Sequence, residues 1–443
     1  MGSHEPSSSS STNGGKKSSF RRKVFSGIKG KKGDEMPEVK KQKKRKAFKM
    51  KKKVFRSSDP LLSVFMWGVH QSVEQLTHCT IPPLLLDTDF KAFSKISIEN
   101  YNFNSDNMTG KFKFKEYCPI VFKNLRDRFG VKEALFNQAL SSCEPYYESK
   151  VQPSRNSLLF DASSAQGDAL KEKERGHKYF YSKDNKFVVK IFHSEEVEFM
   201  HSILNVYYNY AVEKAGQTLL PQYLAMYKIT VSSIEYHMIV MKNVFAVNLR
   251  IHKKYDLKGS KVDRAATDKD PTLKDCDFLN EDMKIRVGEE KRKHILAMLE
   301  SDVQFLSQLK IMDYSLLLGT HNVAQGHEER EMDEEHSSSD DLLDGEEFNN
   351  NKDSDVPMEI EEEEEEVEDQ IYENGYTYFS DPAISNKEVY CFGLIDVLTK
   401  YNATKRAAHT AKTMKHGSGA EISTVRPESY SKRFLEFMSN AFV

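Results

Sequence analysis

Two aspartates in apolar surroundings are the residues most able to do chemistry in this sequence. Asp313 follows a run with helical spacing, and Asp396 lies inside the apolar run 392–398. A carboxylate among apolar side chains destabilises a fold unless a metal ion, a partner or water solvates it. Upstream, Lys190 interrupts the apolar, β-branched run 187–192. One lysine, one metal-holding acid and one acid for the nucleophile are the minimum parts of a phosphoryl-transfer site.

Lys190 has acidic neighbours that could pair with it. Glu195, Glu196 and Glu198 lie a few residues further on, where a helix is expected to start. Kinases use this arrangement, in which a strand lysine pairs with a helix glutamate and then with ATP phosphates. Surface lysines on edge strands are also common, so the pattern alone leaves both interpretations open, and it does not choose between Glu195 and Glu196.

A glycine turn at 256–260 is a second candidate for phosphate chemistry. Gly259 and Ser260 allow a tight turn that offers backbone N–H groups to an anion, and Lys258 and Arg264 add positive charge beside it. A polar hairpin turn without any ligand explains the same residues.

Charge is divided unevenly along the chain. The 443 residues carry a formal net charge of −2, yet residues 328–373 hold 23 Asp and Glu against only Arg330 and Lys352. Residues 1–59 hold 19 Lys and Arg against 5 acidic residues. A basic arm of this density attracts an anionic membrane face or a nucleic acid, although a solvated tail has the same composition. The arm has no pattern of stacking aromatic residues, so no nucleic-acid partner is expected.

Composition argues against several classes of protein. With 38% hydrophobic and 30% charged residues, the sequence indicates an ordinary core with solvated tails or loops. No apolar run approaches the roughly 20 residues of a membrane span, and the N-terminus lacks the apolar stretch of a secretory signal. The five cysteines are scattered, which argues for a reducing compartment and against a disulfide framework or a zinc site.

Periodicity predicts a mixed set of elements around the candidate residues. Apolar residues at helical spacing predict helices over 59–69, after Pro119, over 195–210, over 294–309 and after Pro427. Alternating or β-branched runs predict strands over 111–115, 179–181, 187–192, 236–240 and 389–398. Ser, Gly and charged residues predict a loop over about 140–175.

The candidate motifs, in their order along the chain, resemble the phosphatidylinositol phosphate kinase family. The resemblance rests on Asp-Leu-Lys-Gly-Ser at 256–260, on Met-Asp-Tyr-Ser-Leu-Leu at 312–317 and on the Ile-Asp pair at 395–396. The runs 112–118 and 431–434 also look like the family, and the resemblance covers roughly residues 50–443 without the acidic insert.

Within the family, the late basic loop is most similar to the type II branch, the phosphatidylinositol 5-phosphate 4-kinases. In this family the loop selects the lipid. Type I chains carry a glutamate just before the histidine of the loop, whereas type II chains carry an alanine, and here Ala408 precedes His409.

The resemblance implies an α+β, two-lobed kinase-like fold with antiparallel sheets, a disordered basic N-terminal arm and an acidic insert. The expected domains are the disordered basic arm 1–54, an N-terminal kinase lobe 55–245 and a C-terminal kinase lobe 246–443. The N-terminal lobe would dimerise through a segment near 55–105. The C-terminal lobe would contain the disordered acidic insert 324–385 and an activation loop at about 399–424.

The resemblance also implies a role for each site residue. The catalytic residues would be Asp313 at the attacking hydroxyl, Lys258 beside the transferred phosphate, and Asp256. Asp396 would hold the metal ion. The nucleotide would meet Lys190, Val240, Asn243, Val244, Phe245 and Gly176. The lipid headgroup would meet Lys412, Lys415, Arg264 and Ala408.

The implied activity is that of a phosphotransferase with an alcohol acceptor. It would move the γ-phosphate of ATP to the 4-hydroxyl of phosphatidylinositol 5-phosphate, with Mg²⁺ as cofactor and the product a 4,5-bisphosphate. GTP is an alternative donor because some relatives carry threonine where Met241 stands. We expect a homodimer in the cytoplasm and at the periphery of an anionic membrane, with the nucleus as an alternative location.

Two other functions stay open at this point. One is the type I activity, phosphatidylinositol 4-phosphate 5-kinase. The other is a weakly active phosphoinositide-binding scaffold, because the turn around Gly176 lacks a Gly-x-Gly-x-x-Gly pattern and because Met241 stands where some relatives carry threonine.

Overall fold

The computed structural model describes most of the chain after its basic arm. The described residues are 57, 59–101, 108–141, 179–182, 184–215, 217–245, 249–267, 270, 272–340 (with side chains up to 332), 375–401 and 425–443. The chain divides into two units, 1–51 and 52–443, and every described residue belongs to the second.

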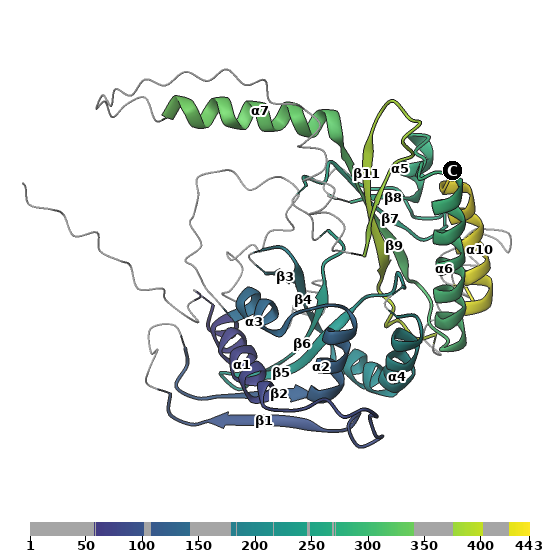
Figure 1. The fold of residues 1–443 in the computed structure, drawn as a ribbon. Helices are drawn as coiled ribbons and strands as arrows, with labels where there is room; N and C mark the ends of the chain where they lie inside the picture. The colour runs from purple at the N-terminus through teal and green to yellow at the C-terminus, as the bar shows by residue number, and fades with distance from the viewer. Residues whose placement is uncertain are drawn as a thin grey trace, which may run out of the picture. The chain divides into compact units, whose positions relative to one another are not determined.

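An antiparallel sheet of six strands forms the first half of the described structure (Figure 1). Its strand order is β1–β2–β5–β6–β4–β3. The strands are β1 (Phe93–Ile98), β2 (Phe112–Tyr117), β3 (Tyr179–Tyr181), β4 (Phe187–Phe192), β5 (Tyr223–Val231) and β6 (Ile234–Lys242).

The two faces of this sheet have different surroundings. On β2, Phe112 and Phe114 are buried, whereas Lys113 between them is exposed. Helix α1 (Pro60–Thr77) packs against β2 and β5, and helix α2 (Pro119–Arg128) packs against β5. The ring of Phe65 in α1 meets Tyr227 in β5. Alternation along the strands therefore places the core on one face and leaves lysines on the other.

Local signals in the sequence explain how these helices begin. Asp59 accepts a hydrogen bond from the Leu61 N–H (2.8 Å) and caps α1, whose first residue is a proline. Two further helices belong to this half, α3 (Glu133–Ser141) and α4 (Ser194–Glu213). In α4 the Glu196 carboxylate accepts a hydrogen bond from the His193 N–H (2.9 Å), which fixes Glu196 at the start of the helix.

A second sheet, of five strands, forms the other half. Its order is β10–β11–β9–β7–β8, with only the β7–β8 pair parallel. The strands are β7 (Lys253–Leu257), β8 (Leu273–Lys274), β9 (Ser315–Asn322), β10 (Thr377–Phe379) and β11 (Glu388–Ile395). The helices are α5 (Asp275–Asn280), α6 (Glu289–Gln308), α7 (Val323–Asp340) and α10 (Pro427–Ala441), and α6 and α10 lie side by side along the sheet (Figure 1).

The buried carboxylate of Asp302 joins the two halves. It lies on α6 and accepts hydrogen bonds from the Tyr210 hydroxyl (2.7 Å), the Thr218 hydroxyl (2.7 Å) and the Leu219 N–H (2.7 Å). Burial raises the pKa of Asp302 to about 6, although these donors favour the charged form. The junction therefore contains a carboxyl group that titrates close to neutral pH.

The expected α+β class with antiparallel sheets is confirmed. Each predicted helix and strand corresponds to an element of the structure, with ends that differ by several residues in some cases. Helices α3 and α5 and strands β1, β5, β7, β8, β9 and β10 were not predicted. Strands β5 and β9 gave no signal because they are buried along most of their length and show little of the polar alternation that marks a half-buried strand.

The prediction that 324–385 lacks regular structure is wrong at both ends. Helix α7 continues to residue 340, and β10 pairs with β11. The base of α7 docks through Glu329, which lies 3.0 Å from Arg250 and 3.4 Å from His252. Acidic composition suggested a solvated segment, and contacts with residues far away in sequence order its first turns instead. Four segments named in the predictions lie outside the described residues: the basic arm, residues 142–178 with most of the predicted loop, residues 341–374 of the predicted acidic insert, and residues 402–424 of the predicted activation loop.

Candidate active site

The second sheet brings three of the predicted residues to one end. Pairing between β9 and β11 ends at Ser315 and Ile395, and β7 ends beside them. Asp313, Lys258 and Asp396 each lie one or two residues beyond the ends of these strands. Because neighbouring strands lie about 4.8 Å apart, residues just past their common end are brought close together.

Both aspartates have an uncommon backbone conformation. Asp313 has a φ angle of 68° and Asp396 one of 58°, in the left-handed region that residues other than glycine rarely adopt. The two segments are joined by a hydrogen bond from the Met312 N–H to the Thr399 carbonyl (3.0 Å) and by a bridge between Ile311 and Lys400. Backbone strain of this kind is concentrated at functional sites.

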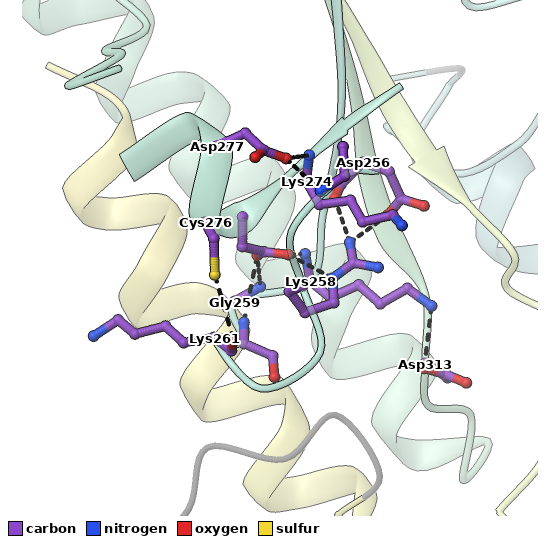
Figure 2. Close-up of polar contacts among 12 residues, drawn as sticks. Asp256, Lys258, Gly259, Lys261, Lys274, Cys276, Asp277 and Asp313 are labelled. Carbon is purple, nitrogen blue, oxygen red and sulfur yellow. Dashed lines mark hydrogen bonds and ion pairs between the residues drawn. The ribbon is translucent and has the colours of Figure 1, made fainter. Parts of the chain in front are cut away.

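Lys258 and Asp313 form an ion pair at this end of the sheet. The Lys258 Nζ lies 3.1 Å from the Asp313 Oδ1, and the two side chains are 15% and 23% exposed (Figure 2). The pair is shielded from solvent, so its attraction is stronger than that of a surface pair, but a ligand can still reach it.

The glycine turn uses its N–H groups differently from the prediction. The Lys258 N–H (2.9 Å) and the Gly259 N–H (2.7 Å) donate to the Asp275 carboxylate, and the Ser260 N–H donates to the same oxygen over 3.4 Å. Asp275 is fully buried. The expectation that these N–H groups are offered to an external anion is therefore wrong, because a carboxylate of the chain itself occupies them. Sequence reasoning missed Asp275, since nothing in the run 272–280 marks it.

Arg264 is also placed differently from the prediction. Its Nε donates to Asp275 (2.7 Å), and its terminal nitrogen donates to the Asp256 carboxylate (2.9 Å). Burial disfavours the charged guanidinium, but the two carboxylates outweigh this effect and raise the pKa of Arg264. The lipid-headgroup role predicted for Arg264 is not supported, because two internal carboxylates hold its guanidinium. Asp256, predicted to be catalytic, is one of these two.

Lys190 lies where the two halves meet. Its Nζ is 3.5 Å from the Glu196 Oε1 on α4 and 3.5 Å from the Asp396 Oδ1 at the end of β11. The lysine is 7% exposed. The choice between Glu195 and Glu196 is thus decided by geometry in favour of Glu196. The ring of Tyr179, opposite Lys190 in the sheet, lies 6.0 Å from the Nζ, and burial together with Asp396 raises the pKa of Tyr179.

Val240 and Asn243, which were predicted to meet the nucleotide, both have contacts within the protein. Val240 is buried in β6 opposite Val189. The Asn243 amide nitrogen donates to the Asn185 carbonyl (2.7 Å), and its oxygen accepts from the Phe245 N–H (3.1 Å). Asn243 therefore shapes the segment that leaves β6, and its contact with a nucleotide stays a prediction.

Val244 and Phe245 connect that segment to the second sheet. The Val244 side chain packs closely at Gly393 of β11, and the ring of Phe245 packs closely at Gly319 of β9. The Nζ of Lys254 lies 5.3 Å from the centre of the Phe245 ring. The two glycines leave room for these side chains, so the connection between the halves is closely packed.

The remaining predicted site residues lie outside the described residues. They are Gly176, Ala408, Lys412 and Lys415. Within the described part of the chain, no group of three or more His, Cys, Asp or Glu could hold a metal ion by itself. Asp396 at the end of the sheet fits Mg²⁺ of the kind that is bound by one or two carboxylates together with substrate phosphates.

The first half supplies the Lys190–Glu196 pair, and the second supplies Asp396 and the Lys258–Asp313 pair. This combination of charged residues is that of a kinase-like protein. Comparison with known proteins agrees. The sequence pattern of the family described as phosphatidylinositol-4-phosphate 5-kinase matches residues 168–441. The chain belongs to this family of phosphatidylinositol phosphate kinases.

Three relatives show how far the similarity extends. Phosphatidylinositol 5-phosphate 4-kinase type-2 alpha of Gallus gallus is 44% identical over 412 residues, which are 90% of this chain and 95% of the relative. The type-2 beta protein of Homo sapiens is 44% identical over 404 residues, 88% and 92% of the two chains. The type-2 gamma protein of Danio rerio is 45% identical over 417 residues, 91% and 95% of the two chains.

Proposed function

We propose that this protein transfers the γ-phosphate of ATP to the 4-hydroxyl of phosphatidylinositol 5-phosphate, forming the 4,5-bisphosphate. The observation that carries the proposal is the convergence of two cation–carboxylate groups at one end of the second sheet. Lys190 lies 3.5 Å from both Glu196 and Asp396, and Lys258 lies 3.1 Å from Asp313. The names of the relatives support this lipid as the substrate.

Lys190 is suited to hold the phosphates of ATP. An ammonium group buried in a strand is costly unless anionic groups meet it. Glu196 orients the Nζ from the first half of the protein, while Asp396 approaches from the second. The phosphates of ATP would add negative charge at this junction.

Asp313 is suited to receive or orient the attacking hydroxyl of the lipid. Its left-handed backbone projects the carboxylate from the end of the sheet beside Lys258. In a loose transition state the charge spreads over the transferred phosphoryl oxygens. The ammonium of Lys258 would stabilise that charge. Electrostatic stabilisation of this kind is usually the largest single contribution to catalysis by a preorganised site.

Asp396 would hold Mg²⁺. When bound, Mg²⁺ supplies charge that neutralises the β- and γ-phosphate oxygens. Asp396 itself is more exposed than Asp313, at 39% against 23% of the side chain, so it is open to an incoming ion. GTP remains an alternative phosphate donor in this proposal.

A basic face on the first sheet supports action at a membrane surface. A hollow on the face of β1, β2 and β5 opposite the core is lined by four lysines and one acid, Lys95, Lys113, Lys115, Lys228 and Glu235, the last paired with Lys228 at 2.8 Å. Burial, followed by repulsion from Lys228 and Lys95, lowers the pKa of Lys115. Lysines gathered in this way attract anionic lipids. No described helix is both long and apolar enough to span a bilayer, and we propose attachment at the membrane periphery from the cytoplasm, with the nucleus as an alternative location.

We also propose that the protein is a homodimer joined through the segment near 55–105. Strand β1 in this segment is the edge of the first sheet, and Phe93 on it is 57% exposed. An edge strand with an exposed aromatic residue is a surface that a second copy can cover. Two copies would extend the basic face across both protomers.

A phosphorylation assay with defined vesicles tests the function. The protein is incubated with labelled ATP and vesicles that contain phosphatidylinositol 5-phosphate, phosphatidylinositol 4-phosphate or phosphatidylinositol. We expect labelled 4,5-bisphosphate mainly from the 5-phosphate. A preference for the 4-phosphate would favour the 5-kinase activity that names the matching family pattern. Vesicle binding without turnover of any lipid would favour a scaffold.

A further inference from the structure

We propose that Asp275 is a positioning residue, which sets the location of the Lys258 ammonium by holding the backbone of its turn. The kinetic tests of this proposal rest on the proposed kinase function, whereas its structural test does not. Asp275 lies at the first position of α5, and its carboxylate binds the Lys258 turn and Arg264, not Asp313 or the end of β11. It acts through Lys258.

The contacts of one carboxylate define the turn. The Asp275 Oδ1 accepts from the N–H groups of Lys258, Gly259 and Ser260, at 2.9, 2.7 and 3.4 Å. The Oδ2 accepts from the Arg264 Nε at 2.7 Å. The side chain is completely buried. A carboxylate that accepts hydrogen bonds from a cation and from successive backbone amides fixes their positions more strictly than a neutral acceptor does.

Arg264 connects this carboxylate to the sheet. Its guanidinium holds Asp275 on one side and Asp256, in β7, on the other. Strand β7 ends at Leu257, one residue before Lys258. The turn is thus fixed to the sheet at its beginning and to α5 along its length (Figure 2).

Helix α10 closes the turn from the other side. Gly259 has a φ angle of 67°, and a Cβ atom there would lie 3.1 Å from the Phe434 Cα and 3.1 Å from the Phe437 Cβ. Only glycine combines this conformation with such close approach of another backbone. With its backbone held on both sides, the turn directs the Lys258 side chain to a point 3.1 Å from the Asp313 Oδ1.

Asp277 offers a matched control on the same helix. Its carboxylate accepts from the Ala266 N–H (2.8 Å) and the Lys274 N–H (2.9 Å), and these contacts do not include the Lys258 turn. Asp275→Asn and Asp277→Asn therefore remove the same charge from the same element. Only Asp275→Asn replaces the carboxylate that accepts from the turn and from Arg264 with an amide, whose oxygen is a weaker acceptor and whose NH₂ cannot accept.

Steady-state kinetics on phosphatidylinositol 5-phosphate vesicles compare the two variants. We expect Asp275→Asn to lower kcat about tenfold with KM for ATP within about twofold, because a displaced group costs rate more than nucleotide binding. Asp277→Asn should keep kcat within about twofold of the unaltered protein. Equal losses of kcat in both variants would mean a general effect on folding and would overturn the proposal.

A double-mutant cycle tests whether Asp275 acts through Lys258. Once Lys258→Ala has removed the ammonium, Asp275→Asn should cost little more, so the two effects should be strongly non-additive. Additive effects would overturn the proposal. If Asp275→Asn does not fold, Arg264→Lys replaces it, since a lysine cannot hold both carboxylates as the guanidinium fork does. The same non-additivity is expected, with a smaller loss of kcat.

A crystal structure of the folded variant supplies a result that is independent of activity. We expect the Lys258 Nζ to leave Asp313 in Asp275→Asn and to remain in place in Asp277→Asn. Retention of the Lys258–Asp313 pair in Asp275→Asn would overturn the proposal. If the unaltered protein turned over no lipid, the proposed function would fail, and this structure would still decide the role of Asp275.

Discussion

Lys190 and Lys258 both face an aspartate at the end of the second sheet, but they are held in different ways. Lys190 lies between the two halves, 3.5 Å from a glutamate of one and 3.5 Å from an aspartate of the other. Lys258 lies within one half, 3.1 Å from Asp313, on a turn whose N–H groups bind a buried carboxylate.

This difference in surroundings indicates that Lys190 and Lys258 have different roles in the site. A cation whose partners come from separate halves changes its surroundings whenever those halves move relative to each other. A cation on a turn fixed by Asp275 and Arg264 keeps its position. We infer that the Lys190 junction responds to nucleotide, whereas the Lys258 turn is preorganised for the transferred phosphate.

Asp396→Asn should have the largest effect, because it removes the charge proposed to hold Mg²⁺ at the Lys190 junction. We expect the rate of lipid phosphorylation to fall by about 10³-fold, the upper range for a single electrostatic contributor. Labelled-product assays measure the rate, and vesicle sedimentation of the same variant is the control. Sedimentation should be unchanged, since Asp396 is not among the residues that line the basic hollow. A variant within tenfold of the original rate would contradict the role of Asp396.

Separate replacement of Lys258 and Lys190 tests directly whether the turn and the junction have different roles. Lys258→Met should lower kcat by about 10²-fold with little change in KM for ATP, because the ammonium is proposed to act on the transition state. Lys190→Met should raise KM for ATP as well as lower kcat. Steady-state kinetics at saturating lipid measure both parameters. The same pattern of kcat and KM in both variants would show that the division between junction and turn is wrong.

The contact between the two halves at Asp302 should make the stability of the protein depend on pH. Its pKa is about 6 in the folded protein and about 4 in an unfolded chain. Between these values only the folded state holds the proton, so this group's contribution to stability falls as pH rises from about 4 to 6 and then stays constant. Asp302→Asn removes that dependence.

Urea unfolding of both proteins measures the Asp302 effect. Between pH 4 and pH 7 the difference in unfolding free energy should shift in favour of Asp302→Asn by about 2 kcal/mol. A difference that does not change with pH would mean that the carboxyl group is not protonated near pH 6. The variant keeps acceptor and donor atoms for the hydroxyls of Tyr210 and Thr218, so its fold should be retained.

Charge reversal on the basic face should have the smallest effect on chemistry and leaves both lysine sites intact. Lys95→Glu combined with Lys113→Glu should weaken binding to anionic vesicles by at least about thirtyfold, since the loss of two basic residues at about 1 kcal/mol each amounts to about 2 kcal/mol. Sedimentation at low and high salt measures the affinity. The double variant should also lose salt sensitivity, and unchanged binding would remove the basic face from the membrane interface.

Much of the site could be predicted from local patterns. Lys190 stands out because it is the one charge in a β-branched run, and Asp313 and Asp396 stand out because apolar runs surround them. The left-handed conformation of both aspartates has no such signal, since neither is a glycine. It follows from the way β9 and β11 end together.

The parts that sequence reasoning missed depend on contacts between distant residues. No local pattern singles out Asp275, and only the docking of α5 brings it to the Lys258 turn. Arg264 looked like an anion-binding residue because its partners, Asp256 and Asp275, lie 8 and 11 residues away. Helix α7 looked like part of a solvated acidic insert, although Glu329 docks on Arg250 and His252.

The sequence by itself determined the chemistry that is available: a strand lysine, two aspartates in apolar runs and a glycine turn, with spacing that matches one family of kinases. It also predicted most of the described helices but fewer than half of the described strands, because hydrophobic periodicity is a local property that marks only some elements. The tertiary structure decided which charges meet. Charges interact over a few ångströms in space whatever their separation along the chain, so only the folded protein pairs Lys190 with Glu196 and Asp396 and assigns the amides of the turn to Asp275.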